Sequence, residues 1–247
     1  MAIIHIINNE VSRAFVADGV LAYGGSPMMS ENHMEFDAIH KHSSALVINL
    51  GMITPEKKTL MFKACQSAVK YGIPIGVDPV GIHISPWRLE VFREIMSTFK
   101  IAFVKGNQDE VYCGIFGLYD GGNKSLEAEQ HFDLELFSSK LLDSKVVWLI
   151  TGEKDYVIGR GRSEDITGGT PDLRKISGAG CLLSALVAVN LSKGQSVFDA
   201  AVKASCDLKK SSESFIDGGT GTLKIKIIDQ LGKTGDSNVY DNVFDNG

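Results

Sequence analysis

Several features that mark large classes of protein are missing from the 247-residue sequence. No run of apolar residues approaches the roughly 20 that a membrane-spanning helix needs, so a membrane is not expected as a partner. The four cysteines stand far apart and form no Cys-x-x-Cys pair, so neither a zinc site nor a disulfide framework is indicated. We therefore expect reduced thiols and a cytoplasmic location.

An excess of positive charge is also missing. Lys and Arg number 25 against 30 Asp and Glu, which gives a formal net charge of -5 at pH 7. Proteins that bind nucleic acid or anionic membranes usually carry a basic patch, so no nucleic acid is expected as a partner. The first residues, MAIIHIINNE, lack the basic start and the long apolar region of a secretory signal. A small molecule is the expected ligand.

The residues that are present predict an α/β fold. Apolar residues make up 44% of the sequence, and short β-branched runs alternate with longer segments of helical period. This pattern predicts a mostly parallel sheet covered by helices on both faces. The expected strands are 3–7, 45–50, 73–77, 101–104 and 145–150, with an antiparallel return at 156–158. The expected helices are 11–23, 35–42, 55–71, 85–100, 126–142 and 197–215, together with the segment that precedes residue 191.

One domain is expected over residues 1–231. Segment 159–171 is rich in Gly, Thr and Ser and predicts a hairpin or flap, and 223–231 is expected as a last short element. Residues 232–247 are polar with scattered Asp and Asn, which predicts a poorly ordered tail.

The stretch KISGAGCLLSALVAVNL, residues 175–191, is a glycine-rich turn that runs into an apolar helix. The first N–H groups of a helix bind anions, which makes Gly178, Ala179 and Gly180 candidates for an anion hole. Glycines before an apolar helix also permit close packing of helix and sheet, and the residues alone leave both interpretations open. The motif lacks the Lys-Ser/Thr of a P-loop, and it comes too late in the chain for a dinucleotide fingerprint.

Cys181 lies on the first turn of the same expected helix. A helix N-terminus lowers the pKa of a thiol and makes it a better base or nucleophile. A single cysteine is also commonly a small buried apolar residue, so its function is not decided by position alone. Met28 and Met29 are similarly open between core packing and the lining of a flat heteroaromatic ligand.

Two acidic residues follow neighbouring expected strands. Asp78, in DPVG, follows strand 73–77, and Asn107 and Glu110, in KGNQDE, follow strand 101–104. Ligands of open α/β sheets collect at the carboxyl ends of strands, and Mg²⁺ binds a few carboxylates together with waters and phosphates. The pair therefore predicts a magnesium site, although Asp78 alone is also compatible with a cap of the next segment and Glu110 alone with a solvated helix residue. His40 and His42 are expected in a solvated turn rather than as metal ligands.

Taken together, these motifs resemble the hydroxyethylthiazole kinases of the ribokinase-like superfamily. The similarity covers almost the whole chain, in order through HIINN, GGSPMM, ALVINLG, DPVG, KGNQDE, ITGEKDYV and SGAGC. It implies a ribokinase-like three-layer fold and transfer of the γ-phosphoryl group of ATP to the hydroxyethyl group of 4-methyl-5-(2-hydroxyethyl)thiazole, in thiamine salvage. It also implies Mg²⁺ as cofactor and a homotrimer with sites at subunit interfaces.

The resemblance also implies roles for individual residues. Cys181 stands where most ribokinase-like enzymes carry the Asp that accepts the alcohol proton. The implied substrate contacts are Met29, Gly178 and Asn8, the last being near a neighbouring subunit. The implied ATP contacts are Lys105, Thr151 and Asn107, the implied magnesium ligands are Asp78 and Glu110, and the implied anion hole is formed by Gly178, Ala179 and Gly180.

Some positions depart from the family pattern and keep alternatives open. Lys105 replaces the usual Arg of the family's RGN motif, which reduces a bidentate phosphate contact to a single point. Arg174 replaces a common Thr before the glycine-rich turn. The alternatives are another vitamin-precursor kinase, for hydroxymethylpyrimidine or pyridoxal, a nucleotide-dependent hydrate repair enzyme, or a non-catalytic thiazole-binding regulator. Cys181 in place of Asp argues against the other kinases, whereas Lys105 and Arg174 leave the regulator open.

Overall fold

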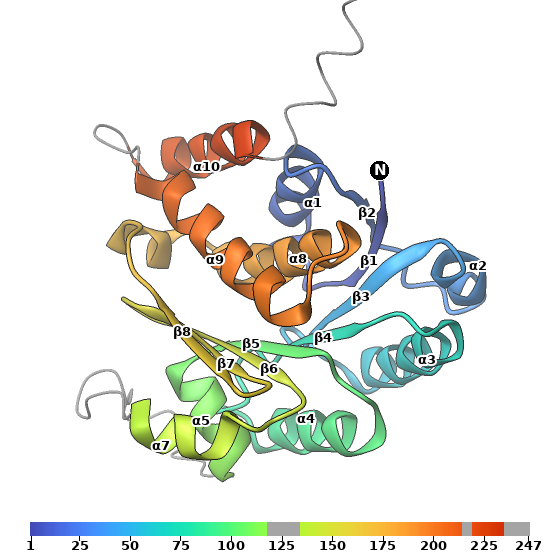
Figure 1. Ribbon diagram of the computed structural model, residues 1–247. Coiled ribbons are helices and arrows are strands. Elements are labelled where there is room, and N and C mark those ends of the chain that lie inside the picture. The colour runs from blue at the N-terminus through green and yellow to red at the C-terminus, as the bar shows by residue number, and fades with distance from the viewer. Residues whose placement is uncertain (118–133, 214–218, 235–247) are drawn as a thin grey trace, which may run out of the picture.

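An eight-stranded sheet forms the middle layer of the computed structural model, which describes residues 1–117, 134–213 and 219–234 (Figure 1). The strand order is β2-β1-β3-β4-β5-β6-β7-β8, and all pairs from β2 to β6 in this order are parallel. The last two strands are antiparallel, as predicted for the return strand and the hairpin. The strands are β1 (Ile3–Ile7), β2 (Ser26–Met28), β3 (Ser43–Asn49), β4 (Ile75–Asp78), β5 (Phe103–Asn107), β6 (Val147–Thr151), β7 (Asp155–Gly159) and β8 (Arg162–Ile166).

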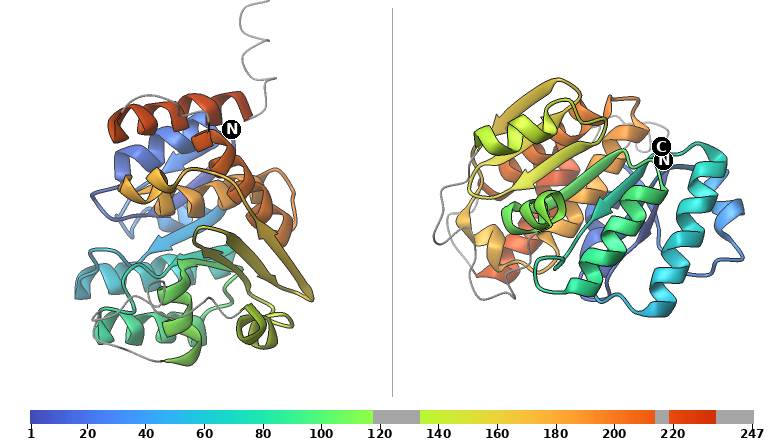
Figure 2. Two further views of the ribbon diagram at one scale, coloured as in Figure 1. Left: turned by 90° about the vertical axis from the view of Figure 1, so that its left-hand side faces the viewer. Right: turned by 90° about the horizontal axis from the view of Figure 1, so that it is seen from below.

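Helices cover both faces of this sheet, which confirms the predicted three-layer α/β class. One face carries α1 (Arg13–Ala22), α8 (Ala179–Ser192), α9 (Val197–Glu213) and α10 (Thr220–Thr234). The other carries α2 (Phe36–His40), α3 (Pro55–Tyr71), α4 (Pro86–Thr98), α5 (Gln108–Phe116) and α7 (Leu134–Leu141). Figure 2 shows the same layers from two further directions. A 3₁₀ helix, η1 (Pro171–Lys175), leads into α8.

The near-continuous apolar strands supply two separate hydrophobic cores, one on each face of the sheet. In β3, Ala45 and Val47 join the cluster beneath α8, whereas Leu46 and Ile48 join the cluster beneath α3 and α4. Successive side chains of a strand point to opposite faces, so a strand buried on both sides is apolar at every position. The two cores hold the strand ends in fixed relative positions.

The predicted start and stop signals of α3 are confirmed. The Thr54 side chain accepts a hydrogen bond from the backbone N–H of Lys57, and Pro55 is the first helical residue. Gly72 ends the helix in the left-handed conformation, at φ 68°.

The bounds of several other elements differ from the prediction, and two of these differences are large. Strand β5 does not stop at residue 104 but continues to Asn107, because a strand ladder needs only backbone groups and Lys105 and Gly106 pair with β6. The short element expected at 223–231 is the 15-residue helix α10, which buries Leu223, Ile227 and Leu231, four residues apart. Helix α10 ends at Thr234, and the rest of the expected tail lies outside the described residues. Residues 126–133 of the helix expected at 126–142 also lie outside them, and residues 134–141 form α7.

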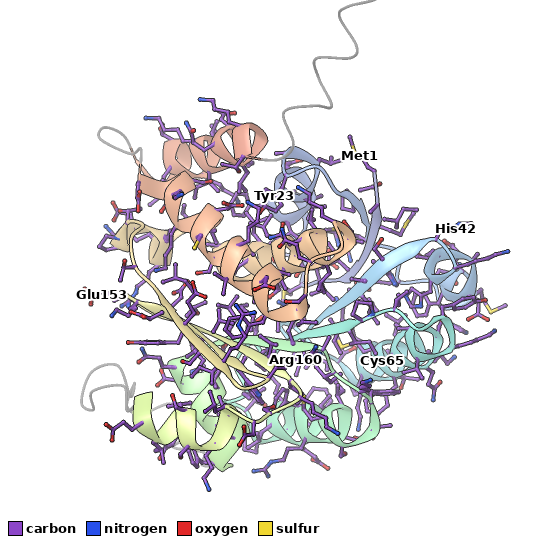
Figure 3. All side chains as sticks on the ribbon, viewed as in Figure 1. Met1, Tyr23, His42, Cys65, Glu153 and Arg160 are labelled. Carbon is purple, nitrogen blue, oxygen red and sulfur yellow. The ribbon has the colours of Figure 1, made fainter. Side chains whose placement is uncertain are left out.

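The carboxyl ends of the parallel strands bring polar residues to one edge of the sheet. Asn49, Asp78, Asn107 and Thr151 are the last residues of β3, β4, β5 and β6. Figure 3 labels Glu153, in the turn after β6 at this edge, and Arg160, at the opposite end of β7. Among the described residues, no helix combines the length and the hydropathy that crossing a membrane requires.

The prediction that His40 lies in a solvated turn is wrong. His40 is 1% exposed, and its Nε2 lies 2.7 Å from Nδ1 of His5 on β1. The other nitrogen of His5, Nε2, lies 2.9 Å from the carbonyl oxygen of Ser30. A carbonyl oxygen only accepts, so His5 Nε2 carries a hydrogen. Burial lowers the pKa of both rings, which keeps His5 neutral, so its Nδ1 is an acceptor and His40 donates to it. The pair is therefore neutral, with each ring protonated on Nε2.

This neutral pair makes the protein lose stability in mild acid. Burial, and then the proximity of His5, lower the pKa of His40 to about 4, and Asp37 opposes the shift only in part. The folded-state pKa lies below the unfolded value of 6.5, so protonation favours the unfolded state. The contribution of His40 is complete above pH 6.5 and is lost as the pH falls toward 4, by up to roughly 3 kcal/mol at 1.36 kcal/mol per pKa unit.

Urea unfolding at about pH 7 and about pH 4.5 measures this loss. Because carboxylates also titrate, the comparison is with His40→Gln, which removes the imidazole and keeps an N–H donor. We expect the difference in unfolding free energy between the two proteins to shift in favour of the variant at the lower pH. Parallel pH dependence in the two proteins would contradict the assignment.

Candidate active site

Gly178 begins the helix that carries the glycine-rich motif. Its φ of 92° lies in the left-handed region, and a Cβ there would lie 2.6 Å from the Cβ of Ser12 on the neighbouring segment. Glycine is thus required both by conformation and by close packing. The N–H of Ala179 donates to the carbonyl of Ile176 at 3.3 Å, whereas the N–H groups of Gly180 and Cys181, in the first turn of α8, have no carbonyl within the helix to bind. The packing interpretation and the anion-hole interpretation are therefore compatible.

Cys181, on the first turn of α8, accepts hydrogen bonds from two buried amides. Its Sγ lies 3.2 Å from Nδ2 of Asn49 and 3.4 Å from Nδ2 of Asn9. Burial and the charge of Asp78 raise the pKa of Cys181 above its ordinary value, against the opposing effect of Lys105 and the hydrogen bonds. The expected lowering by the helix N-terminus is outweighed, so the thiol is mainly protonated at neutral pH.

A buried ion pair lies directly below the motif. Lys105 Nζ donates to Asp78 Oδ1 at 2.8 Å, and the two side chains are 5% and 0% exposed. Asn49 donates to the other oxygen, Asp78 Oδ2, at 2.7 Å. Burial alone would lower the pKa of Lys105, but Asp78, Cys181 and Glu110 hold it above its ordinary value. A Cβ on Gly180 would lie 3.0 Å from Lys105 Nζ, so this positive charge sits beneath the first turn of α8.

Glu110 is a buried capping residue at the start of α5. Its Oε2 accepts from the N–H of Asn107 and its Oε1 from the N–H of Gly81, both at 2.9 Å. The Asn107 side chain accepts in return from the N–H of Glu110, which completes a capping box. Burial raises the pKa of Glu110, with Lys105 opposing and Asp78 adding to the rise. The solvated role considered for Glu110 from the sequence is wrong, because the side chain is buried and caps α5.

A cavity of about 360 Å³ opens beside the motif. It brings together four of the predicted residues, Asn107, Thr151, Ala179 and Gly180. Thr151 donates its hydroxyl hydrogen to the carbonyl of Gly106 at 3.3 Å. Lys105, Asp78, Glu110 and Cys181 do not line this cavity; they adjoin it through Gly180 and Asn107.

A buried lysine that sequence reasoning missed, Lys209, lines the cavity on the side of α9. Lys209, on α9, donates to the carbonyls of Glu153 at 3.1 Å and Gly168 at 3.4 Å. Its Nζ also lies 3.3 Å from Asp155, whose other oxygen accepts from Ser205 at 2.7 Å. Lys209 thus ties the β6–β7 turn and the segment after β8 to α9. Nothing in the local pattern of an amphipathic helix indicates this role.

Asn8 and Met29 lie away from the cavity, at the carboxyl ends of β1 and β2. Asn8 Oδ1 accepts from the N–H of Asn9 at 2.9 Å and from the hydroxyl of Ser12 at 3.3 Å. Its Nδ2 is buried and has no hydrogen-bond partner among the described residues. Met29 is partly buried and packs against the core cluster beneath α8. Ser12 contacts both Asn8 and the Gly178 turn, so these residues adjoin the motif on the side opposite the cavity.

Asn9 and Asn49 are site residues that sequence reasoning missed. Both hold the sulfur of Cys181, and Asn9 donates to Asn49 Oδ1 at 3.1 Å. Asn49 ends an apolar strand, as Asp78 does. The strand-end rule that selected Asp78 therefore selects Asn49 as well, had it been applied to every strand.

The described residues contain no group of three or more His, Cys, Asp or Glu side chains that could enclose a metal ion. Asp78 ends β4, Glu110 lies on the first turn of α5, directly after the adjacent strand β5, and each carboxylate oxygen accepts one protein hydrogen bond. A carboxylate oxygen has capacity for a second partner. The pair fits a magnesium ion that keeps waters and binds phosphate oxygens, but not a metal held by protein ligands alone.

Comparisons with known proteins agree with this geometry. A model of the hydroxyethylthiazole kinase family matches residues 1–235. A hydroxyethylthiazole kinase of Haemophilus influenzae is 32% identical over 235 residues, which cover 93% of this chain and 88% of that protein. The solved structure of a hydroxyethylthiazole kinase protein from Pyrococcus horikoshii OT3 has a TM-score of 0.77 and 26% identity, over 94% of this chain and 88% of that chain.

A more distant structure shares the fold alone. An E. coli protein assigned as a Ribokinase II, in complex with ATP and Mg²⁺, has a TM-score of 0.59 and 10% identity, over 94% of this chain and 99% of that chain. The sheet order, the strand-end residues and the match over nearly the full length lead to one assignment. The chain belongs to the hydroxyethylthiazole kinase family.

Proposed function

We propose that the protein transfers the γ-phosphoryl group of ATP to the hydroxyethyl oxygen of 4-methyl-5-(2-hydroxyethyl)thiazole, with Cys181 and the Gly178 turn at the point of transfer. One observation carries the proposal. The glycine-rich turn lies between the cavity that Thr151 and Asn107 line and the region where Asn8 and Met29 lie. A donor and an acceptor bound on the two sides meet at the first turn of α8.

Both buried and exposed cations give the nucleotide side a positive potential, and the exposed Arg174 is among the residues that line the cavity. The N–H groups of Gly180 and Cys181 lie at the positive end of α8, and Lys105 lies beneath them. Because Lys105 is buried and paired with Asp78, it acts on the phosphates through its charge rather than as a flexible surface contact. Phosphoryl transfer depends mainly on such positioning and charge stabilisation.

Magnesium is the cofactor that this reaction class requires. Asp78 and Glu110 would hold it, and it would supply Lewis-acid stabilisation of the phosphate charge. The likeness to the E. coli protein with ATP and Mg²⁺ supports this, as do the two buried carboxylates of Asp78 and Glu110, which interact electrostatically with each other. Lys105 and Asn49 orient Asp78, and the backbone N–H groups of Gly81 and Asn107 orient Glu110.

In this proposal, the alcohol proton leaves toward Cys181. Its raised pKa leaves only a small thiolate fraction at neutral pH, so it is a modest base. A loose transition state releases the alcohol proton late and needs little base strength. The rate is therefore expected to depend more on the anion hole than on the thiol.

The direct test is incubation with ATP, Mg²⁺ and the thiazole alcohol, with ADP release as the readout. Pyridoxine and hydroxymethylpyrimidine serve as the control acceptors. We expect turnover on the thiazole and little on the controls. Turnover on a control alone would assign a different vitamin-precursor kinase, and thiazole binding without ADP release would assign a non-catalytic regulator. A homotrimer is part of the same proposal, and size-exclusion chromatography tests it.

A further inference from the structure

The neutral His5–His40 pair lies next to the acceptor side of the site but takes no part in the chemistry described above. His5 is on β1, opposite Met28 in the register between β1 and β2. Its ring packs against Phe36 at a centroid distance of 5.2 Å and donates to the carbonyl of Ser30. That carbonyl belongs to the residue directly after Met29.

Ser30 and Glu31, which follow Met29, are held by contacts of different strength. Glu31 pairs with Arg13 at 2.6 Å and with Lys57 at 3.1 Å, and the Glu31 side chain is 33% exposed. Partly exposed ion pairs hold a segment weakly, because water competes and salt screens them. The bond from His5 starts from a fully buried ring and leads to a backbone atom, so it fixes the main chain itself.

His40 decides which nitrogen of His5 carries the hydrogen. With His40 donating to Nδ1, His5 must present Nε2–H to Ser30. Without that donor, the imidazole can take the other tautomer, and Nε2 would then face the carbonyl oxygen as a second acceptor. His40, which does not itself contact Ser30, thus favours the tautomer of His5 that donates to the Ser30 carbonyl.

We propose that His5 is a positioning residue for the thiazole acceptor: by donating Nε2–H to the Ser30 carbonyl, it fixes the position of the preceding residue, Met29. His40 sets the tautomer of His5 that this hydrogen bond requires. This rests on the proposed function, in which Met29 contacts the thiazole. The pair acts on acceptor binding, and the nucleotide cavity lies on the other side of the Gly178 turn. Loss of the pair therefore raises KM for the thiazole and leaves KM for ATP unchanged.

The test compares His40→Leu with His40→Gln. Leucine removes the donor to His5, whereas the glutamine amide can still donate to Nδ1. We expect KM for the thiazole to rise roughly five- to tenfold in His40→Leu, as for one lost hydrogen bond, with KM for ATP unchanged and kcat within about twofold. His40→Gln is expected to stay close to the parent protein. His42→Leu is the matched control, since His42 is exposed and lies two residues further along.

Two further readouts do not need turnover. Nitrogen-15 chemical shifts are expected to show both rings as Nε2–H tautomers, and hydrogen–deuterium exchange of the segment around residues 28–31 is expected to rise in His40→Leu but not in His40→Gln. An unchanged thiazole KM in folded His40→Leu, equal rises in both KM values, unchanged exchange, or failure of glutamine to rescue would overturn the inference. Absence of thiazole turnover in the parent protein would instead contradict the proposed function, while exchange and tautomer state would still decide the role of the pair.

Discussion

Valine in place of Gly178 is expected to lower the rate of phosphoryl transfer by roughly 100- to 1000-fold, the loss typical when a transition-state donor is removed. The side chain would meet Ser12, whose Cβ lies 2.6 Å from the position of a Cβ on residue 178. The φ of 92° is also strained for any β-branched residue. The turn must therefore move, and the N–H groups of Ala179 and Gly180 move with it. Steady-state ADP release with the thiazole and ATP measures the effect.

Gly194 provides the matched control at the other end of the same helix. Its φ is 82°, and no atom lies within 4 Å of an added Cβ. Gly194→Val therefore carries a similar backbone cost without displacing Ser12 or the first turn of α8. We expect this variant to keep nearly full activity. If folded Gly178→Val retained more than about a tenth of the parent rate, the anion-hole role of the turn would be wrong.

Methionine in place of Lys105 is expected to destabilise the protein by roughly 3–5 kcal/mol, the usual cost of leaving a buried charge without its partner. Asp78 is completely buried, and Lys105 is its cationic neighbour at 2.8 Å. The same change removes the positive charge beneath Gly180, so activity is expected to fall by at least about 100-fold. Urea unfolding measures the first effect and ADP release the second.

The double variant Asp78→Asn/Lys105→Met separates these two effects. Both charges are then gone, so much of the lost stability is expected to return, since a neutral pair carries no uncompensated buried charge. Activity is not expected to return, because the charge near the phosphates and a proposed magnesium ligand are both absent. Lys70→Met, at the exposed pair with Asp37, is the control and is expected to change the unfolding midpoint little. Full stability of the single Lys105→Met variant would contradict the account.

Strand-level features were predictable because they depend on neighbouring residues. Continuous apolar runs identified the buried parallel strands, and Thr54, Pro55 and Gly72 marked the ends of α3. The ordered motifs also identified the family and its reaction, which the family match confirms. The position of Asp78 at a strand end followed from the same local reasoning. The roles of individual site residues stay predictions that the variants above test.

Other features depend on contacts between distant parts of the chain and left no local signal. His40 is buried because His5, 35 residues away, accepts its hydrogen, although the surrounding HKH sequence is polar. Lys209 is buried because two carbonyls and Asp155 surround it, and none of these lies on its own helix. The raised pKa of Cys181 likewise comes from burial and from Asp78, more than a hundred residues earlier in the chain.

The two outer strands of the sheet limit how copies of this protein can associate. β2 has three residues, and its middle residue, Pro27, has no N–H to donate to a further strand. β8 presents Arg162, Ser163, Glu164 and Asp165 to solvent, so a strand docked there would bring charged side chains against its own. Both margins therefore disfavour edge-to-edge addition and the aggregation that follows from it. We therefore expect subunit contacts to form through helices and loops rather than by addition of strands to the sheet.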